Sequence, residues 1–379
     1  MKITSTTITG RKNIKREQPY RADKKAKKVA HVVKKVRPNN VEDTDLIDLT
    51  NEVDLVALSF EGKVKHSPKD KEARRDVVRT MLTEIQEAAK KYKPLSLGKK
   101  APQKKNGESL CMLFSDWHVG KVIKTRSGKH IFDSEIAINR IMNEIPQQFE
   151  DYISNRVSSK NIEEIVIFFA GDVVDNDIIY PGQRLHVDNG VAVQFRDAIN
   201  AIHTMIRKFR VAADKHIGKN IPIRVECITG NHGRAGKDSE TPICSWDTAA
   251  YAALDLTMRA SGVKDIEIGY SLEDQRVTNV RGLRALMIHH LPPTTEGPSA
   301  KKTFGGLYEI FDYDFCVYGD LHHWGVGCWQ GKPCMMNGSL CGYDDYAISL
   351  ALRDDWSQLM WIVKDNEPVE ELTRFKRIT

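Results

Sequence analysis

Five short stretches of the sequence carry aspartate, histidine or asparagine directly after an apolar run. In chain order they are Asp116-Trp117-His118, Gly171-Asp172-Val173-Val174-Asp175, Gly230-Asn231-His232-Gly233, His289-His290-Leu291-Pro292-Pro293 and Gly319-Asp320-Leu321-His322-His323. Carboxylate, imidazole and amide groups suit divalent ions of the Mn²⁺, Fe or Zn²⁺ type. Two such ions about 3.5 to 4 Å apart, sharing one carboxylate, can activate water and hold a phosphoryl group. The chemistry indicated is therefore hydrolysis of a phosphate ester.

These stretches are placed by the strands predicted before them. The runs SLCMLFS, EEIVIFFA, IPIRVECIT, LRALMIHH and FDYDFCVYG are short and apolar, and GCWQGKPCMMNGS and SQLMWIVK add two more predicted strands. Helical patterns lie between them at 134–155, 190–214 and 244–261. The alternation predicts an α/β domain with buried sheets covered by helices. Because the carboxyl ends of strands in open α/β sheets point into a ligand crevice, we expect the five stretches to meet there.

Each stretch alone says little, because Gly-Asp pairs are common in turns and a buried histidine is more often a hydrogen-bonded core residue. The ordered set is the specific signal. It resembles the calcineurin-like metallophosphoesterase superfamily, whose signature is D-x-H, G-D, G-N-H-[D/E], H-[G/H] and G-H-x-H, each after a β-strand. The resemblance covers about residues 109–365. It implies an α/β fold of the metallophosphoesterase type, a β-sandwich flanked by helices.

The resemblance also implies roles for individual residues. The implied metal-binding residues are Asp116, His118, Asp172, Asn231, His289, Asp320 and His322. Asp172 would bridge the two ions. His232 is the implied catalytic residue, protonating the leaving oxygen or stabilising charge on the phosphate. The implied cofactors are two divalent metal ions, of which Mn²⁺ is favoured and Mg²⁺, Fe or Zn²⁺ are alternatives.

Two positions depart from the family signature. Gly233 stands where a carboxylate usually follows G-N-H, so the group that orients His232 must come from elsewhere or be absent. Asp320 stands where G-H-x-H has its first histidine. A carboxylate there would make the site harder and more anionic, and we hypothesise a preference for Mn²⁺ or Mg²⁺ over Zn²⁺.

Several neighbouring residues allow both a functional and a structural interpretation. Arg234 and Arg184 are candidate substrate-binding residues, since a guanidinium can hold a phosphate oxygen, but both could equally be solvated loop charges. Asp175 could orient a ligand histidine or only stabilise its own turn. His290 and His323 each sit beside a predicted ligand, and strand alternation predicts that they point away from the site.

Composition bounds the class of protein. The chain has 379 residues, of which 41% are hydrophobic and 28% charged, enough to bury a large core. No apolar run reaches the length that a bilayer needs, and the first residues lack the pattern of a secretory signal, so we expect an intracellular, cytoplasmic protein without membrane contact. The seven cysteines are scattered and form no CxxC pair, which predicts reduced core thiols.

Charge divides the chain into two parts. Residues 1–105 carry 27 Lys and Arg against 14 Asp and Glu, a net charge of +13, while the remainder carries −7. We predict a basic, partly disordered N-terminal extension over residues 1–107 and a catalytic domain over 108–379. KDKEARRDVVRTMLTEIQEAAKKY within the extension has the apolar spacing of one amphipathic helix, and residues 93–107 read as a linker.

Three functions fit these features. The leading hypothesis is a nuclease acting on DNA, similar to phage or bacterial DNA-repair members of the superfamily, with the basic extension and the active site both contacting nucleic acid. The second is a phosphatase or phosphodiesterase acting on phosphoprotein or a small molecule. The third is a non-catalytic binding module that keeps the fold, which Gly233 and Asp320 would favour.

Overall fold

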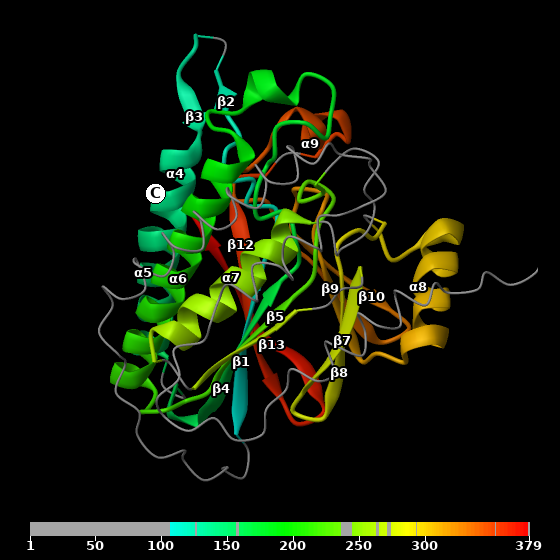
Figure 1. The fold of residues 1–379 in the computed structure, drawn as a ribbon. Coiled ribbons are helices and arrows are strands. Elements are labelled where there is room, and N and C mark those ends of the chain that lie inside the picture. Colours follow the sequence, from blue (N-terminus) through cyan, green and yellow to red (C-terminus); the bar gives the residue numbers. More distant parts are fainter. Residues whose placement is uncertain are drawn as a thin grey trace, which may run out of the picture. The chain divides into compact units, whose positions relative to one another are not determined.

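Two β-sheets packed face to face form the centre of the described part of the chain (Figure 1). The computed structural model describes residues 107–125, 127–156, 159–235, 245–262, 265–270, 274–292, 294–352 and 354–377. The predicted N-terminal extension, with its amphipathic helix and linker, lies outside the described residues apart from Gly107. The predicted domain boundary therefore stays a prediction.

The first sheet has six strands in the order β13-β12-β1-β4-β5-β6. The strands are β1 (Glu108–Phe114), β4 (Ile162–Phe169), β5 (Ile223–Cys227), β6 (Ile266–Tyr270), β12 (Ser357–Lys364) and β13 (Glu367–Lys376). Strands β1, β4, β5 and β6 are parallel neighbours. The helices between them in sequence are α4 (Ser134–Asn139), the π-helical turn η1 (Arg140–Glu144), α5 (Ile145–Asn155), α6 (Val191–His216) and α7 (Trp246–Ala260). Parallel strands bring their carboxyl ends to one edge of the sheet.

The second sheet has five strands in the order β10-β11-β9-β8-β7. They are β7 (Gln275–Val280), β8 (Leu283–Ile288), β9 (Phe315–Tyr318), β10 (Gly325–Trp329) and β11 (Lys332–Met336). Its three central strands β8, β9 and β11 are parallel, and α8 (Gly297–Phe311) joins β8 to β9. The smaller elements are the β2 (Ile123–Lys124) and β3 (His130–Phe132) pair, helix α9 (Asp345–Ser349), and 3-10 turns at Ser159–Asn161 and Gln183–His186.

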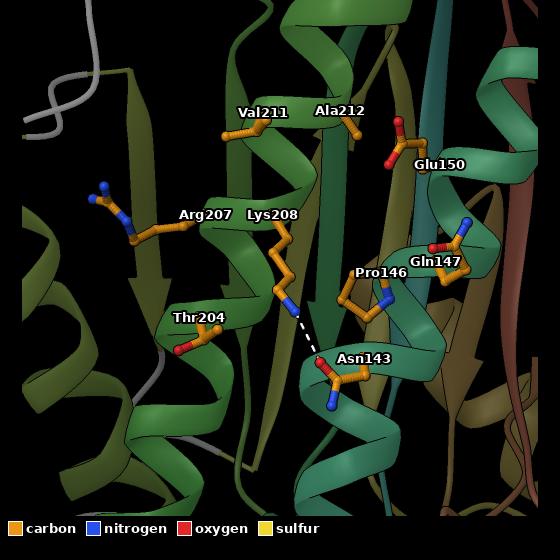
Figure 2. A pocket seen from close by; sticks show the side chains of 9 residues that line it. All are labelled: Asn143, Pro146, Gln147, Glu150, Thr204, Arg207, Lys208, Val211 and Ala212. Carbon is orange, nitrogen blue, oxygen red and sulfur yellow. Dashed lines mark hydrogen bonds between the residues drawn. The ribbon is translucent and has the colours of Figure 1, made fainter. Parts of the chain in front are cut away.

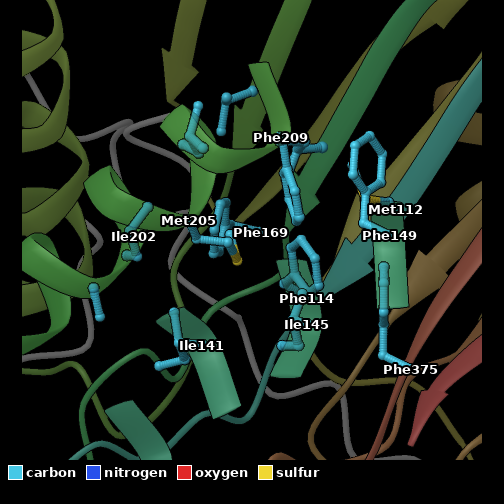
Figure 3. Close-up of a cluster of buried hydrophobic side chains, with 14 of the residues drawn as sticks. Met112, Phe114, Ile141, Ile145, Phe149, Phe169, Ile202, Met205, Phe209 and Phe375 are labelled. Carbon is cyan, nitrogen blue, oxygen red and sulfur yellow. The ribbon is translucent and has the colours of Figure 1, made fainter. Parts of the chain in front are cut away.

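The alternation of side chains along β1 divides the interior into two cores. Cys111 and Leu113 face the second sheet and pack in the core between the sheets. Met112 and Phe114 face the helices, where Phe114 lies 6.3 Å from the ring of Phe209 on α6 (Figure 3). A third core forms where α8 covers the outer face of the second sheet. The layers are therefore helix, sheet, sheet and helix.

This architecture confirms the predicted α/β sandwich flanked by helices in its coarse form. Two predicted strands were wrong in detail. GCWQGKPCMMNGS is not one strand but the β10–β11 hairpin, which turns at Gln330 and Gly331 with φ of 49° and 82°. FDYDFCVYG is extended only at Phe315–Tyr318, because its first residue ends α8. Strands β6, β7 and β13 and helix α8 were not predicted; the glycines at 297, 305 and 306 weaken the helical signal of α8.

The described cysteines are all free thiols, and five of the six are buried, Cys328 being exposed. This agrees with the prediction of reduced core thiols. Among the described residues, no helix is both long and apolar enough to span a membrane.

The core between the two sheets gives a test of the fold, and two aromatic side chains of the first sheet lie in it. Phe168 on β4 stacks on Trp361 of β12 with ring centroids 5.8 Å apart, and both side chains are fully buried. We expect Phe168→Ala to lower the free energy of unfolding by about 3–5 kcal/mol in chemical denaturation, because the cavity cannot close between two rigid sheets. Val211→Ala, on the exposed face of α6, is the control and should stay within about 0.5 kcal/mol of the wild type. A loss below about 1 kcal/mol for Phe168→Ala would contradict this packing.

Candidate metal centre

The seven side chains predicted to bind metal lie together at the edge where the parallel strands of both sheets end. They follow β1 (Asp116, His118), β4 (Asp172), β5 (Asn231), β8 (His289) and β9 (Asp320, His322). All except the half-buried Asn231 are buried. The structure thus brings the predicted residues to one place, while their role as metal ligands stays a prediction.

Asp116, His118 and His322 form the first cluster. Their nearest ligand atoms all lie within 4.8 Å of one another. The Nε2 atoms of His118 and His322 are 2.9 Å apart, and Nε2 of His322 is 3.7 Å from Oδ1 of Asp116. These are the separations expected of atoms that share one ion, rather than of three independent contacts.

The positions of the histidine protons follow from the contacts of the opposite ring nitrogens. Nδ1 of His118 lies 3.0 Å from a carboxylate oxygen of Asp175, and Nδ1 of His322 lies 3.0 Å from one of Asp344. Each carboxylate favours a proton on Nδ1, which leaves a lone pair on Nε2. Two such lone pairs facing each other at 2.9 Å repel unless a positive charge lies between them. The pair is therefore suited to a cation.

A second cluster contains Asp116, Asp172 and His289. Nδ1 of His289 lies 2.6 Å from the carbonyl oxygen of Ala170, so its proton is directed there and Nε2 carries a lone pair. That Nε2 is 3.3 Å from Oδ2 of Asp172 and 3.6 Å from Oδ1 of Asp320. It is buried without a hydrogen bond. A third imidazole lone pair thus points at carboxylates.

Asn231 and Asp172 complete the arrangement. Asn231 donates through Nδ2 to Oδ1 of Asp320 at 3.1 Å, while its Oδ1 is buried without a hydrogen bond and free to act as a ligand. Oδ2 of Asp172 lies 3.3 Å from His289 and 4.0 Å from Nε2 of His118. Asp172 is therefore next to both clusters, the position expected of a bridging carboxylate.

The electrostatics of these groups reflect the same need for positive charge. Burial raises the pKa of Asp116 to about 6, and burial lowers the pKa of His118 to about 3, which keeps its imidazole neutral and able to bind metal. Burial also opposes charge on His289, but Asp172 raises its pKa well above the usual value. A positive charge is therefore favoured beside Asp172, whether a proton or a metal ion supplies it.

Five of the seven predicted ligands have positive φ. The values are 54° for Asp116, 47° for His118, 55° for Asp172, 71° for Asp320 and 54° for His322. Left-handed backbone at residues other than glycine is uncommon and costs free energy, and it gathers at functional sites where the surrounding structure enforces it. Its concentration here marks the strand ends as a built site rather than ordinary turns.

Two glycines allow the loops to approach closely. A Cβ atom at Gly171 would lie 2.2 Å from the backbone nitrogen of Gly230, and Gly171 has φ of 90°. A Cβ atom at Gly230 would lie 2.1 Å from Oδ1 of Asp172. Glycine is thus required at both positions for Asp172 and Asn231 to come within reach of the same ion.

Two further carboxylates and a lysine hold the histidines. The side chain of Asp175 faces His118 and also lies 3.3 Å from Nδ1 of His232, so it orients the two rings rather than only its own turn. Lys121 pairs with Asp344 and lies 3.9 Å from Asp175. Asp175 therefore orients His232. The residue after G-N-H usually has this role in the family signature, but here that residue is a glycine without a side chain to do so. Sequence reasoning missed Lys121 and Asp344.

Asp247 at the start of α7 was also missed. Its carboxylate accepts hydrogen bonds from the backbone nitrogens of Asp172 (3.0 Å), Val173 (3.1 Å) and Gly230 (2.9 Å). A Cβ atom at Gly233 would lie 2.7 Å from this carboxylate. The glycine that departs from the family signature therefore leaves room for a carboxylate that arrives from another element.

The two arginines predicted to bind substrate are not among the residues that line the recess beside the cluster. Arg234 donates through Nε to the carbonyl oxygen of Asn231 at 2.7 Å, and its guanidinium lies 5.9 Å from the ring centroid of Tyr180. The side chain of Arg184 is 75% exposed and lies 3.5 Å from Asp177. Arg234 is thus held beside the cluster and Arg184 is directed to solvent, and both roles stay predictions.

The expectation for His290 was wrong. Its Nδ1 lies 2.6 Å from Oδ2 of Asp320, so it contacts a predicted ligand instead of pointing away. Strand alternation did not apply because β8 already ends at Ile288. His323 lies 3.8 Å from Asp354, which is not one of the predicted ligands.

The cluster lines a recess of about 890 Å³. Asp172, His232, His289 and His322 reach it from the sheet edge, and Tyr180 and Tyr346 border it. A separate recess of about 520 Å³ lies between α5 and α6, where Lys208 donates to Asn143 at 2.9 Å (Figure 2). None of the predicted site residues lines that second recess.

The fold and the cluster define a two-sheet α/β sandwich with a candidate site for divalent cations. No family model matches the chain, and no curated protein matches it. Similar solved structures include a Vps29 variant from Entamoeba histolytica, with 11% identity, a TM-score of 0.32, and coverage of 71% of this chain and 99% of that chain. A novel archaeal phosphodiesterase has 11% identity and a TM-score of 0.32 over 70% and 98%. Hypothetical protein PH1004 from Pyrococcus horikoshii OT3 has 9% identity and a TM-score of 0.33 over 71% and 87%.

The position of Asp247 gives a test of how the site is held. We expect Asp247→Asn to raise the Kd for Mn²⁺ by about tenfold in calorimetric titration, because the amide nitrogen would face a backbone N–H and leave a buried donor unpaired, at a cost of about 1–3 kcal/mol. Asp255→Asn makes the same change on the partly exposed side of α7, and should leave the Kd unchanged. Equal affinities in Asp247→Asn and the wild type would show that this carboxylate does not support the site.

Proposed function

We propose that this protein is a phosphodiester hydrolase of the calcineurin-like metallophosphoesterase type that uses two divalent cations and acts on DNA. One observation carries the proposal. The imidazole lone pairs of His118, His322 and His289 lie beside buried carboxylates, an arrangement that fits positively charged ions. The proposed family is inferred from the ordered set of residues that follow the strands in the sequence.

The donor set fits hard or borderline cations. Asp116, His118 and His322 would hold one ion, and Asn231 and His289 the other, with Asp172 shared between them. Bound cations would polarise a phosphate ester and lower the pKa of water. Burial raises the pKa of the nearby Cys341 to about 12, which disfavours a thiolate ligand. We propose Mn²⁺ as the native ion because oxygen ligands predominate beside the three imidazoles.

His232 is the residue that we propose for proton transfer. Its backbone N–H donates to Asp172 at 2.7 Å, and its side chain is 16% exposed toward the recess. Burial lowers the pKa of the ring, but Asp172 and Asp175 raise it above the usual value, which favours the protonated form. A protonated ring at the floor of a recess can donate to a leaving oxygen or stabilise phosphate charge.

DNA is proposed as the substrate from the distribution of charge. Residues 1–105 carry +13, whereas the remainder carries −7. An anionic catalytic part attracts a polyanion poorly by itself, and the basic segment would supply the missing phosphate contacts. Arg234, held against the backbone of Asn231, is the proposed contact to a phosphate oxygen.

The activity is tested with the purified full-length chain. With Mn²⁺, Mg²⁺ or Zn²⁺ added after stripping, linear duplex DNA, single-stranded DNA and bis-p-nitrophenyl phosphate are compared as substrates. We expect DNA hydrolysis, best with Mn²⁺, and a loss of at least about 100-fold in Asp172→Asn, since the shared carboxylate charge is removed. Asp255→Asn should retain full activity.

Other outcomes of that comparison would replace the proposal. Hydrolysis of the small diester alone would indicate a small-molecule phosphodiesterase, and hydrolysis of a phosphopeptide added to the panel would indicate a phosphatase. A folded protein that hydrolyses none of these substrates would indicate a non-catalytic binding module.

The role of the basic segment is tested separately by DNA binding. We expect deletion of residues 1–100 to weaken binding at least about tenfold at low salt and to flatten the dependence of Kd on salt, because fewer counterions are released. A chain in which the 13 Lys and Arg of residues 1–40 are replaced by Gln keeps the length and should show part of the same loss. Unchanged affinity and salt dependence in both variants would remove this segment from DNA binding.

A further inference from the structure

Five aromatic rings contact one another in series beside the recess, and four of them line it. In order along the series, ring centroids are 4.9 Å apart for Tyr180 and His232, 4.5 Å for His232 and His118, 4.7 Å for His118 and His322, and 5.4 Å for His322 and Tyr346. The three histidines are the central members, and a tyrosine stands at each end. The end members thus contact the histidine cluster at two places, Tyr180 at His232 and Tyr346 at His322.

The two tyrosines are more exposed to solvent than the histidines of the series. Tyr180 is 42% and Tyr346 41% exposed, and both border the recess, whereas His118 and His322 are buried. A partly exposed aromatic side chain that borders a polar pocket can contact a ligand there. The apolar Leu185, 84% exposed, also borders the recess.

Both tyrosines are held in place by the residues that hold the centre. Gln183 accepts hydrogen bonds from the backbone nitrogens of Ile179 and Tyr180 and donates to the carbonyl oxygen of Asp175. Tyr346 lies in the first turn of α9, whose N-cap Asp344 also contacts His322. A ring fixed in this way loses little conformational entropy when a ligand stacks on it.

The recess has the size and the polarity for a nucleotide-like ligand. Its volume of about 890 Å³ falls within the range of pockets that enclose organic ligands, about 300–1,000 Å³. Its floor binds a phosphate in the proposed function, and both tyrosines line the same recess. Bases offer a planar face for stacking whatever their sequence. In a duplex those faces are already stacked on neighbouring base pairs.

We propose that Tyr180 and Tyr346 stack on the two planar groups that flank the scissile phosphate, so that the substrate is a diester joining two unpaired nucleosides. This inference rests on the proposed function and narrows it from DNA in general to single-stranded or unpaired nucleotides. Tyr180 and Tyr346 would determine specificity and would take no part in the bond cleavage itself.

The test compares ligands that differ only in their bases. A thymidine octanucleotide and an abasic octanucleotide have the same backbone charge, so the basic segment contributes equally to both. Binding to the full-length chain is measured by fluorescence anisotropy and hydrolysis as kcat/KM with Mn²⁺. We expect the wild type to bind and hydrolyse the thymidine strand at least about 100-fold better than the abasic strand, and Tyr180→Leu and Tyr346→Leu each to lower that preference by about tenfold.

Conservative and distant variants separate stacking from other effects. Tyr346 donates its hydroxyl to Asp320 at 3.3 Å, so Tyr346→Phe removes this bond but keeps the ring, and it should retain the preference within about twofold. Tyr180→Phe should behave likewise. Tyr270→Leu, at a 36% exposed tyrosine that does not line the recess, should match the wild type. An equal loss in the phenylalanine variants would overturn the stacking role.

The outcomes also distinguish this inference from the proposed function. Hydrolysis of methyl p-nitrophenyl phosphate without any preference for bases would overturn the inference alone. A preference for bases in binding that depends on both tyrosines, without hydrolysis of any diester, would overturn the proposed function alone.

Discussion

Three imidazole lone pairs beside buried carboxylates are the constraint on which the rest of the site depends. In the neutral rings, Nε2 of His118, His322 and His289 carries a lone pair, because the opposite nitrogens face Asp175, Asp344 and the carbonyl of Ala170. Burial removes the water that would otherwise screen the carboxylates, so the repulsion is large unless a cation enters. The protein must therefore hold an arrangement that is not favourable by itself.

The scaffold holds this arrangement in two ways. Left-handed backbone at five ligands costs of the order of 1–3 kcal/mol each, and only the packing of both sheets beneath the loops can enforce it. The loops are then tied to one another, since Asp247 accepts hydrogen bonds from both Asp172 and Gly230. Lys121 pairs with Asp344 and lies close to Asp175, so the two carboxylates that orient histidines share the ammonium group of one lysine. The side chains that make the site rigid are thus not themselves predicted metal ligands.

Much of the site could be predicted from the sequence because it obeys a local rule, since each ligand follows a strand and parallel strands end together. Asp247 and Asp344 lie outside that rule. Asp247 lies in the first turn of α7, and Asp344 caps the start of α9. Both are far in sequence from most of the groups they contact, and the packing of the two helices brings them close to those groups. The contact of His290 was missed because alternation ends with β8. The hairpin turn at Gln330 and Gly331 was missed because both residues have positive φ, and a pattern of apolar residues does not reveal a turn of this kind.

Asp320 and His290 bear on the charge of the centre. A carboxylate in place of a histidine adds negative charge, but Oδ2 of Asp320 lies 2.6 Å from Nδ1 of His290 and within 3.3 Å of the hydroxyl of Tyr346. Asp320 raises the pKa of His290, so the pair has less net charge than the carboxylate alone. His290 is 67% exposed in its side chain, and solvent screens this compensation only in part because Asp320 is buried. Oδ1 of Asp320 remains near His289 and Asn231, so a hard oxygen ligand is kept while much of its excess charge is offset.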